Sequence, residues 1–189
     1  MNKSSDGSVP EAFSSPAWPR QVHRIFSDHR IRQVCHVPDA GHRELMDLCR
    51  RDPEIQSVPL TTEEEGVGLA MGAWLGGSKS VLLLQSSGVG NLINVLGALR
   101  ECRFPFLMLV TMRGEEGEAN PWQVPMGRAT PTVLEAMGVE VVRAESEGEV
   151  APALEELAQR VFREEIQVAL LLSQRLLGAK SFREEGGGE

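Results

Sequence analysis

The sequence has few cysteines, no long apolar run and no excess of basic residues. Its 3 cysteines, Cys35, Cys49 and Cys102, are far apart and form no C-x-x-C pair, which argues against a disulfide framework or a zinc motif and predicts free thiols. No apolar stretch reaches the roughly 18 residues that a membrane helix needs, and the N-terminus lacks the apolar segment of a secretory signal. The formal net charge of −8 argues against a nucleic-acid surface. We expect a cytoplasmic protein that binds neither nucleic acid nor membrane.

Two common catalytic signatures are also missing. Ser86 and Ser87 follow an apolar segment but do not lie in the Gly-x-Ser-x-Gly elbow of a hydrolase. The glycine-rich turn at 86–91 lacks the lysine of a phosphate-binding P-loop. A plain strand-to-helix turn therefore remains one interpretation of this segment.

The chain of 189 residues predicts one folded domain with flexible ends, and its hydrophobic content of 41% can fill a core. Residues 1–16 are rich in Ser, Pro and Gly and predict a disordered leader. Residues 183–189 are charged and then glycine-rich, and predict a flexible tail. The domain is expected at 17–182.

Between these ends, apolar patterns predict strands and helices in alternation. Strands are expected at 32–37, 56–60, 80–85, 105–111, 139–143 and 166–172. Helices are expected at 18–30, 43–51, 63–75, 88–102, 130–137 and 147–162. This order predicts a single three-layer α/β domain with a mainly parallel six-stranded sheet. The loops at 38–42, 85–91 and 112–128 would leave the carboxyl ends of strands, where such sheets bind ligands.

The segment 61–74 is the most informative part of the chain. Thr62 and Glu65 have the spacing of a capping box, and acidic residues also suit the first turn of a helix, so stability alone can explain the glutamates. Helical spacing does not choose among Glu63, Glu64 and Glu65 as an inward-facing acid.

The glycines of the same helix favour a functional interpretation. Gly66, Gly68, Gly72 and Gly76 each cost about 1 kcal/mol of helix propensity relative to alanine. A helix that accepts them is expected to pack closely against another backbone or another subunit. A carboxylate buried there would hold its proton more firmly, as a donor to a ring nitrogen requires.

Four stretches of this sequence resemble the alpha-subunit type of sulfopyruvate and phosphonopyruvate decarboxylases, which are thiamine-diphosphate enzymes. They are His36-Val37-Pro38-Asp39, Glu63 to Gly68, Gln85 to Asn91, and Arg113-Gly114-Glu115 leading to Met126-Gly127. The resemblance spans about residues 20 to 172 and implies the pyrimidine-binding domain of that family. Aligning Gly66 and Trp74 with the family pattern selects Glu64 as the catalytic acid, which would hydrogen-bond the pyrimidine ring of the cofactor.

The resemblance also implies further ligand contacts and a partner. Ser87, Gly88 and Asn91 would bind the cofactor together with Glu64. Contacts to a small anionic 2-oxoacid substrate would come from Pro38, Asp39, His42, Arg113 and Gln123. Thiamine diphosphate would bind with Mg²⁺ held by a separate diphosphate-binding beta subunit, in an α₂β₂ complex. The isolated chain would then form a homodimer.

A departure from the family pattern and the Ser- and Pro-rich leader leave a second hypothesis open. Where relatives often have Gln-His before Met-Gly, this chain has Gln123-Val124-Pro125. The Gly-Asp-Gly and Asn-Asn pair for the metal and diphosphate belongs to a second domain of the family and does not occur in this sequence. The first hypothesis is a catalytic subunit that is weak or inactive alone. The alternative is a non-catalytic binding or regulatory module that keeps the pyrimidine-domain fold.

Overall fold

A computed structural model of the chain describes residues 16–178 and contains one parallel sheet. Its strands are β1 (Ile31–His36), β2 (Gln56–Pro59), β3 (Lys79–Gln85), β4 (Phe106–Thr111), β5 (Glu140–Ala144) and β6 (Gln167–Leu172). They lie in the order β2-β1-β3-β4-β6-β5, and every neighbouring pair is parallel. The structure therefore confirms the predicted α/β class.

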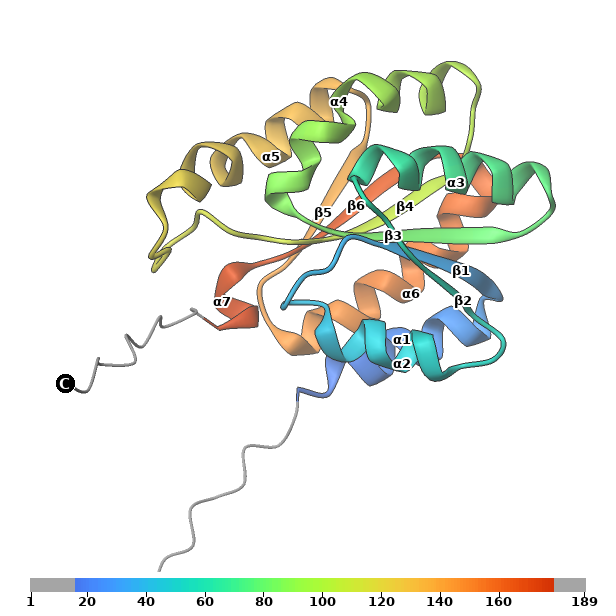
Figure 1. The fold of residues 1–189 in the computed structure, drawn as a ribbon, viewed down its shortest axis with the longest axis horizontal. Helices are drawn as coiled ribbons and strands as arrows, with labels where there is room; N and C mark the ends of the chain where they lie inside the picture. Colours follow the sequence, from blue (N-terminus) through green and yellow to red (C-terminus); the bar gives the residue numbers. More distant parts are fainter. Residues whose placement is uncertain (1–15, 179–189) are drawn as a thin grey trace, which may run out of the picture.

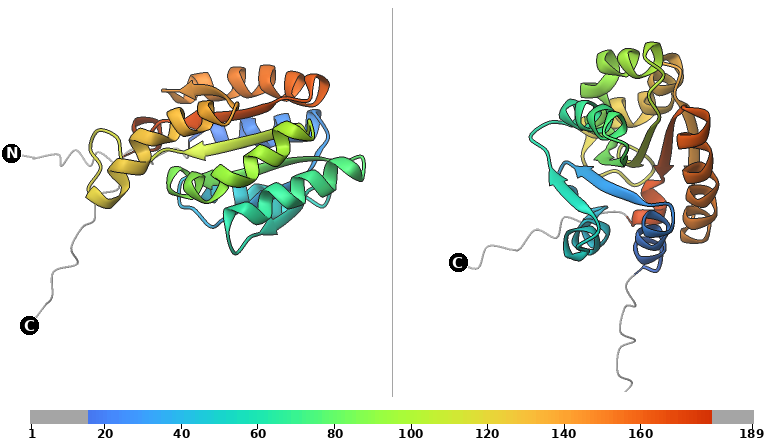
Figure 2. Two further views of the ribbon diagram at one scale, coloured as in Figure 1. Left: turned by 90° about the horizontal axis from the view of Figure 1, so that it is seen from above. Right: turned by 90° about the vertical axis from the view of Figure 1, so that its right-hand side faces the viewer.

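Helices cover both faces of this sheet (Figure 1). They are α1 (Trp18–Asp28), α2 (Arg43–Arg51), α3 (Glu63–Leu75), α4 (Ser86–Glu101), α5 (Val124–Ala136), α6 (Glu147–Glu164) and the short α7 (Gln174–Leu177), with a 3₁₀ turn η1 (Pro121–Gln123) before α5. Helices α1, α2 and α6 lie on one side, and α3, α4 and α5 lie on the other, a separation that the views in Figure 2 also show.

Two hydrophobic clusters hold the three layers together. One joins α1, α2 and α6 to the sheet, and the other joins α3, α4 and α5 to its opposite face. All residues of β4 are buried because helices cover this central strand on both sides. The apolar stripe expected in α6 is buried as well: Val150, Leu154, Leu157 and Val161. The predicted three-layer architecture is thus present.

Several predicted boundaries need correction. Helix α4 begins at Ser86, directly after β3, so most of the segment expected as a loop at 85–91 is helical. The expected loop at 112–128 ends early, because η1 and the first turns of α5 occupy its second half. The pattern at 130–137 was too short for the whole of α5, which starts with Pro125 in its first turn and contains Pro131. The expected leader and tail lie almost entirely outside the described residues.

The strand order has a switch point between β1 and β3. The chain moves from β1 to β2 on one side and from β3 to β4 on the other, so the connections that follow β1 and β3 diverge there. In sheets of this kind, ligands bind beyond the carboxyl ends of the strands at this point. Asp39 follows β1 and Gln85 ends β3, which places both at the switch point. Within residues 16–178, no helix is both long enough and apolar enough to cross a membrane.

Candidate active site

A buried carboxylate lies at the start of α3, and it belongs to Glu63. This residue is only 8% exposed. Asn91 donates a hydrogen bond of 2.7 Å from Nδ2 to Glu63 Oε2. The carboxylate also lies against Gly88 so closely that a side chain at position 88 would collide with it. Two turns of chain far apart in sequence, at the starts of α3 and α4, thus meet around one acid.

Glu64 is the acid that the family resemblance selected. It is exposed to solvent, beside the buried Glu63. The Thr62 hydroxyl and a backbone N–H at the helix start hold the pKa of Glu64 below its ordinary value, which is the behaviour of a solvated carboxylate in a first turn. In the isolated chain the inward-facing acid is therefore Glu63 and not Glu64. Which of the two acts on a cofactor stays a prediction.

The spacing of the apolar residues explains this outcome. Gly66, Val67 and Ala70 are the other buried residues of α3, and they lie three, four and seven positions after Glu63. A residue at these intervals shares the face that packs on the sheet, where Gly66 contacts Leu82. Counting the buried stripe back from Ala70 would have selected Glu63 from the sequence, whereas alignment on Gly66 and Trp74 selected its neighbour.

A second buried carboxylate, Asp39, ties together the ends of three strands. Its side chain is 6% exposed and accepts hydrogen bonds from Thr111 Oγ1 (2.6 Å), Gly41 N (3.1 Å) and Gln85 Nε2 (3.2 Å). Gly41 fits here because a Cβ would press on Thr111 and on Asp39. Burial alone would raise the pKa of Asp39, but His42 and these donors outweigh it and hold the pKa below its ordinary value.

Ser87 is connected to Asp39 through Gln85. Its hydroxyl donates a hydrogen bond of 2.8 Å to Gln85 Oε1, while the Gln85 amide nitrogen faces Asp39. Ser87 itself is exposed and immediately precedes Gly88. The structure therefore brings together four of the residues selected from the sequence, in two groups: Asp39 with Ser87, and Gly88 with Asn91.

His42 is corrected as a substrate-contact residue, because it is completely buried. It precedes Leu45 and Cys49 by three and seven positions, and all three lie on the inner side of α2. Nδ1 of His42 is 3.5 Å from Asp39 Oδ2, and the Trp18 ring lies edge-on with a centroid distance of 6.4 Å. His42 can influence the site by acting on Asp39.

Arg113 follows β4 and is held by Glu118. Its Nε and Nη2 donate to the two oxygens of that carboxylate at 2.6 and 2.5 Å, and the Glu118 side chain is only 1% exposed. Gly114 N, Asn120 N and Gln174 Nε2 also donate to Glu118. These donors, led by Arg113, keep the pKa of Glu118 well below its usual range. The carboxylate of Glu118 thus balances the charge of Arg113. The Nη1 nitrogen of Arg113 takes no part in this ion pair.

A small cavity of about 70 Å³ lies between these groups, and its lining includes Asp39, Gly41, Thr111 and Arg113. Of the remaining substrate candidates, Pro38 is exposed in the connection after β1. Gln123 is partly buried at the end of η1, where its backbone packs on Gly114. Gln123 therefore lies beside the Arg113 loop.

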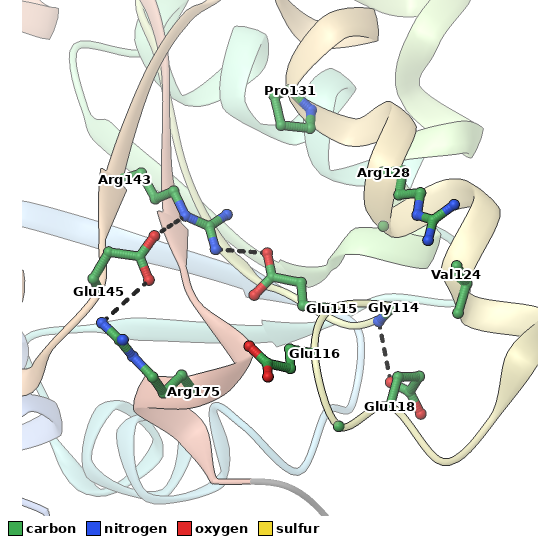
Figure 3. A pocket seen from close by; sticks show the side chains of 12 residues that line it. Gly114, Glu115, Glu116, Glu118, Val124, Arg128, Pro131, Arg143, Glu145 and Arg175 are labelled. Atoms are coloured by element: carbon green, nitrogen blue, oxygen red, sulfur yellow. Dashed lines mark hydrogen bonds and ion pairs between the residues drawn. The ribbon is translucent and has the colours of Figure 1, made fainter.

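A larger, open pocket of about 710 Å³ is lined in part by the loop residues Gly114 to Glu118, which follow Arg113 (Figure 3). Arg143 points into it and pairs with both Glu115 and Glu145, while Arg175 is 3.8 Å from Glu145. Arg128 projects from α5 without a dashed contact in this view. Acidic and basic side chains alternate around this pocket, so it does not form a uniformly positive anion site.

The residues around Glu63 fit the pyrimidine side of thiamine diphosphate. Glu63 Oε2 is engaged by Asn91, whereas no hydrogen bond to Oε1 is present in the part of the chain that the structure describes. Gly88 leaves room for the carboxylate where any side chain would fill it. Within residues 16–178 no cluster of three His, Cys, Asp or Glu side chains is placed to hold a metal ion.

Proteins of similar sequence show the family of this chain. No family model matches the chain. The chain is 39% identical over 152 residues to sulfopyruvate decarboxylase subunit alpha of Methanothermobacter thermautotrophicus, covering 80% of this chain and 92% of that protein. It is 34% identical to the same subunit of Methanococcus maripaludis, again covering 80% of this chain and 91% of that protein. The chain belongs to the family of sulfopyruvate decarboxylase alpha subunits.

More distant matches extend in two directions. Phosphonopyruvate decarboxylase of Streptomyces viridochromogenes is 34% identical to this chain over 112 residues. The match covers 58% of this chain and 28% of that protein. The fold is shared with 2-oxoglutarate:ferredoxin oxidoreductase of Magnetococcus marinus, with a TM-score of 0.65 and 14% identity over 85% of this chain and 29% of that one. The resemblance predicted from the four sequence stretches is thus confirmed.

Proposed function

We propose that this chain is the pyrimidine-binding subunit of a thiamine-diphosphate-dependent 2-oxoacid decarboxylase and works with a separate diphosphate-binding subunit. The observation that carries the proposal is the buried Glu63, held by Asn91 against Gly88. Membership of a family whose named relatives are sulfopyruvate decarboxylase alpha subunits supports the reaction class. We expect the diphosphate and its Mg²⁺ to be held by the partner subunit.

In this proposal Glu63 takes the role that the family resemblance gave to Glu64. Its free Oε1 would share a proton with a ring nitrogen of the pyrimidine, and Asn91 would keep the carboxylate from turning away. When bound, the cofactor supplies the electron sink that decarboxylation of a 2-oxoacid requires. Burial of Glu63 excludes water from the proton that it shares, which strengthens this interaction.

The substrate side is proposed for the small cavity between Asp39 and Arg113. Nη1 of Arg113 is the group suited to the anionic end of a 2-oxoacid, and Glu118 orients the guanidinium for that contact. Pro38 and Gln123 flank this region on the connections after β1 and before α5. Sulfonate and phosphonate substrates are both in keeping with the relatives.

Paired substitutions at adjacent residues test the assignment. In the complex with its partner subunit, Glu63→Gln should lower carbon dioxide release from sulfopyruvate or phosphonopyruvate by about 10²-fold or more, since a positioned proton-transfer group contributes that much. Exchange of the C2 proton of the bound cofactor should slow in parallel. Glu64→Gln is the matched control and should remain close to wild type.

The other outcomes are equally informative. A large loss in Glu64→Gln with a normal Glu63→Gln would return the role to Glu64. If the wild-type complex binds the cofactor but releases no carbon dioxide from any 2-oxoacid, the chain is a binding module.

A further inference from the structure

Asp39, Gln85 and Ser87 form a continuous chain of hydrogen bonds at the switch point of the sheet. Gln85 Nε2 is 3.2 Å from Asp39 Oδ1, and Ser87 Oγ is 2.8 Å from Gln85 Oε1. We propose that Asp39, acting through Gln85, fixes the Ser87 hydroxyl as a hydrogen-bond acceptor toward the bound molecule. Asp39 and Gln85 are then positioning residues, and Ser87 is the group that touches the ligand. The identity of that ligand rests on the proposed function, but the internal hydrogen bonds do not.

The direction of each hydrogen bond follows from the chemistry of Asp39. An ionised carboxylate only accepts hydrogen bonds, so the Gln85 amide must turn its NH₂ group toward Asp39. The Gly41 N–H and the Thr111 hydroxyl occupy the other carboxylate oxygen. The opposite orientation of Gln85 would place its carbonyl oxygen against a carboxylate oxygen, which is repulsive. The carbonyl of Gln85 therefore faces Ser87.

Ser87 has a single hydroxyl hydrogen, and Gln85 Oε1 takes it. The remaining lone pairs of Ser87 Oγ are left for the solvent side, because this residue is exposed. Ser87 lies in the first turn of α4, one residue before the Gly88 that contacts Glu63. The molecule that binds here is thus recognised at Ser87 by an N–H or O–H donor of its own, such as the amino group of a pyrimidine.

One isosteric substitution inverts this polarity without removing a hydrogen bond. In Asp39→Asn, the fixed N–H of Gly41 requires an oxygen at its position, so the new NH₂ group must face Gln85. Gln85 then turns its carbonyl toward residue 39 and its NH₂ toward Ser87. Ser87 becomes the acceptor in that bond, and its hydrogen points toward the ligand. The Ser87 hydroxyl then faces the N–H or O–H donor of the ligand, and two donors cannot form a hydrogen bond.

A second substitution restores the original polarity. In the double variant Asp39→Asn with Gln85→Glu, the carboxylate has moved from position 39 to position 85. The carboxylate at position 85 accepts from the NH₂ group of residue 39 and from the Ser87 hydroxyl, which becomes a donor to it again. The net charge equals that of the wild type, so this variant separates polarity from charge.

The experiment measures thiamine diphosphate affinity by calorimetry in the complex with the partner subunit, at a fixed Mg²⁺ concentration. Asp39→Asn should weaken binding about tenfold and Ser87→Ala about fivefold, in keeping with the loss of one hydrogen bond. In the Ser87→Ala background, Asp39→Asn should add less than about twofold, and the Asp39→Asn/Gln85→Glu variant should return to within about twofold of wild type.

Hydrogen exchange of the Gln85 side-chain amide, measured on the full chain without ligand, tests the internal hydrogen bonds. The Gln85 side-chain amide protons, identified by their absence in Gln85→Glu, should exchange slowly with solvent in the wild type, because they face an Asp39 side chain that is 6% exposed. In Asp39→Asn they face the exposed Ser87 and should exchange faster.

Each result decides the matter. Unchanged amide exchange in Asp39→Asn, equal losses from Asp39→Asn in both backgrounds, or failure of the double variant to recover would each overturn the proposal. If the wild-type complex does not bind thiamine diphosphate, the proposed function fails. The amide exchange then decides the positioning role alone.

Discussion

The burial of His42 makes the stability of the folded chain sensitive to acid. Burial lowers the pKa of this histidine to about 4, with Asp39 opposing the shift and His36 adding to it. His42 is therefore neutral in the folded protein near pH 7. An unfolded chain takes up a proton on histidine below a pH of about 6.5. The unfolded state then binds more protons than the folded state, so acid favours unfolding.

The low pKa of His42 predicts a pH window for the stability of the chain. The free energy of unfolding should fall as the pH drops from about 6.5 toward 4, and His42 should account for on the order of 2 kcal/mol of that loss. Urea titrations of the wild type at several pH values measure this fall. In His42→Gln the free energy of unfolding should fall less over that window, whatever the stability of the variant at pH 7. Parallel curves for the two proteins would mean that His42 is not the titrating group.

At the scale of elements, the segment between β4 and η1 is fastened to α7. Gln174 at the start of α7 exchanges hydrogen bonds with Glu115: its N donates to Glu115 Oε2 at 2.8 Å, and Glu115 N donates to Gln174 Oε1 at 3.0 Å. Its Nε2 also donates to Glu118 at 3.0 Å. The four-residue helix that the sequence pattern missed is thus the support of the loop that carries Arg113.

Removing the charge of Glu118 should loosen this attachment. Glu118→Gln leaves Arg113 without its partner, and we expect a loss of about 2 kcal/mol in the free energy of unfolding at pH 7. Because the pKa of Glu118 is lowered in the folded state, its contribution is complete above a pH of about 4.3 and shrinks as the pH falls further. Glu116→Gln, at an exposed neighbour, is the control. A loss that does not depend on pH would indicate a packing effect instead.

The elements were predictable where one physical requirement dominated. The apolar runs of β3, β4 and β6 and the stripe of α6 follow from burial, and they were found at nearly the right boundaries. Helix α7 has four residues, too few for a periodic pattern, and was missed. In α3 the bounds were correct, but the buried acid is Glu63 and not the Glu64 that the resemblance selected, because a one-residue difference changes which side of a helix a residue occupies.

The site was less predictable than the fold because its contacts are tertiary. The sequence cannot show that Glu118 lies on Arg113, or that Gln85 bridges Asp39 and Ser87, since these pairs depend on where strand ends meet. The family resemblance selected residues that follow β1, β2, β3 and β4. The structure shows which of them are joined by hydrogen bonds and that His42 is buried.

At the scale of the whole molecule, helix α3 presents an open surface of small and apolar residues. Gly66 is packed on Leu82, but apart from the adjoining backbone of α3 no atom of residues 16–178 lies within 4 Å of the position where Gly68 or Gly72 would carry a side chain. Leu69 and Leu75 are 37% and 78% exposed. Among the residues that the structure describes, the close packing expected for the glycines of this helix is thus found only at Gly66.

We expect this face of α3 to meet another subunit in an α₂β₂ complex, and Gly72→Leu tests it. A leucine there fits the isolated chain, since it points into open space, but it would hold an approaching backbone away. The variant should unfold at the same urea concentration as wild type, yet elute as smaller species when mixed with the partner subunit. It should also leave thiamine diphosphate binding as weak as in the isolated chain, which lacks the metal and diphosphate contacts.

Gly148→Leu, at an equally open position on α6 across the sheet, is the matched control and should assemble normally. Full assembly of Gly72→Leu, or micromolar cofactor binding and decarboxylation by the isolated wild-type chain, would contradict this arrangement.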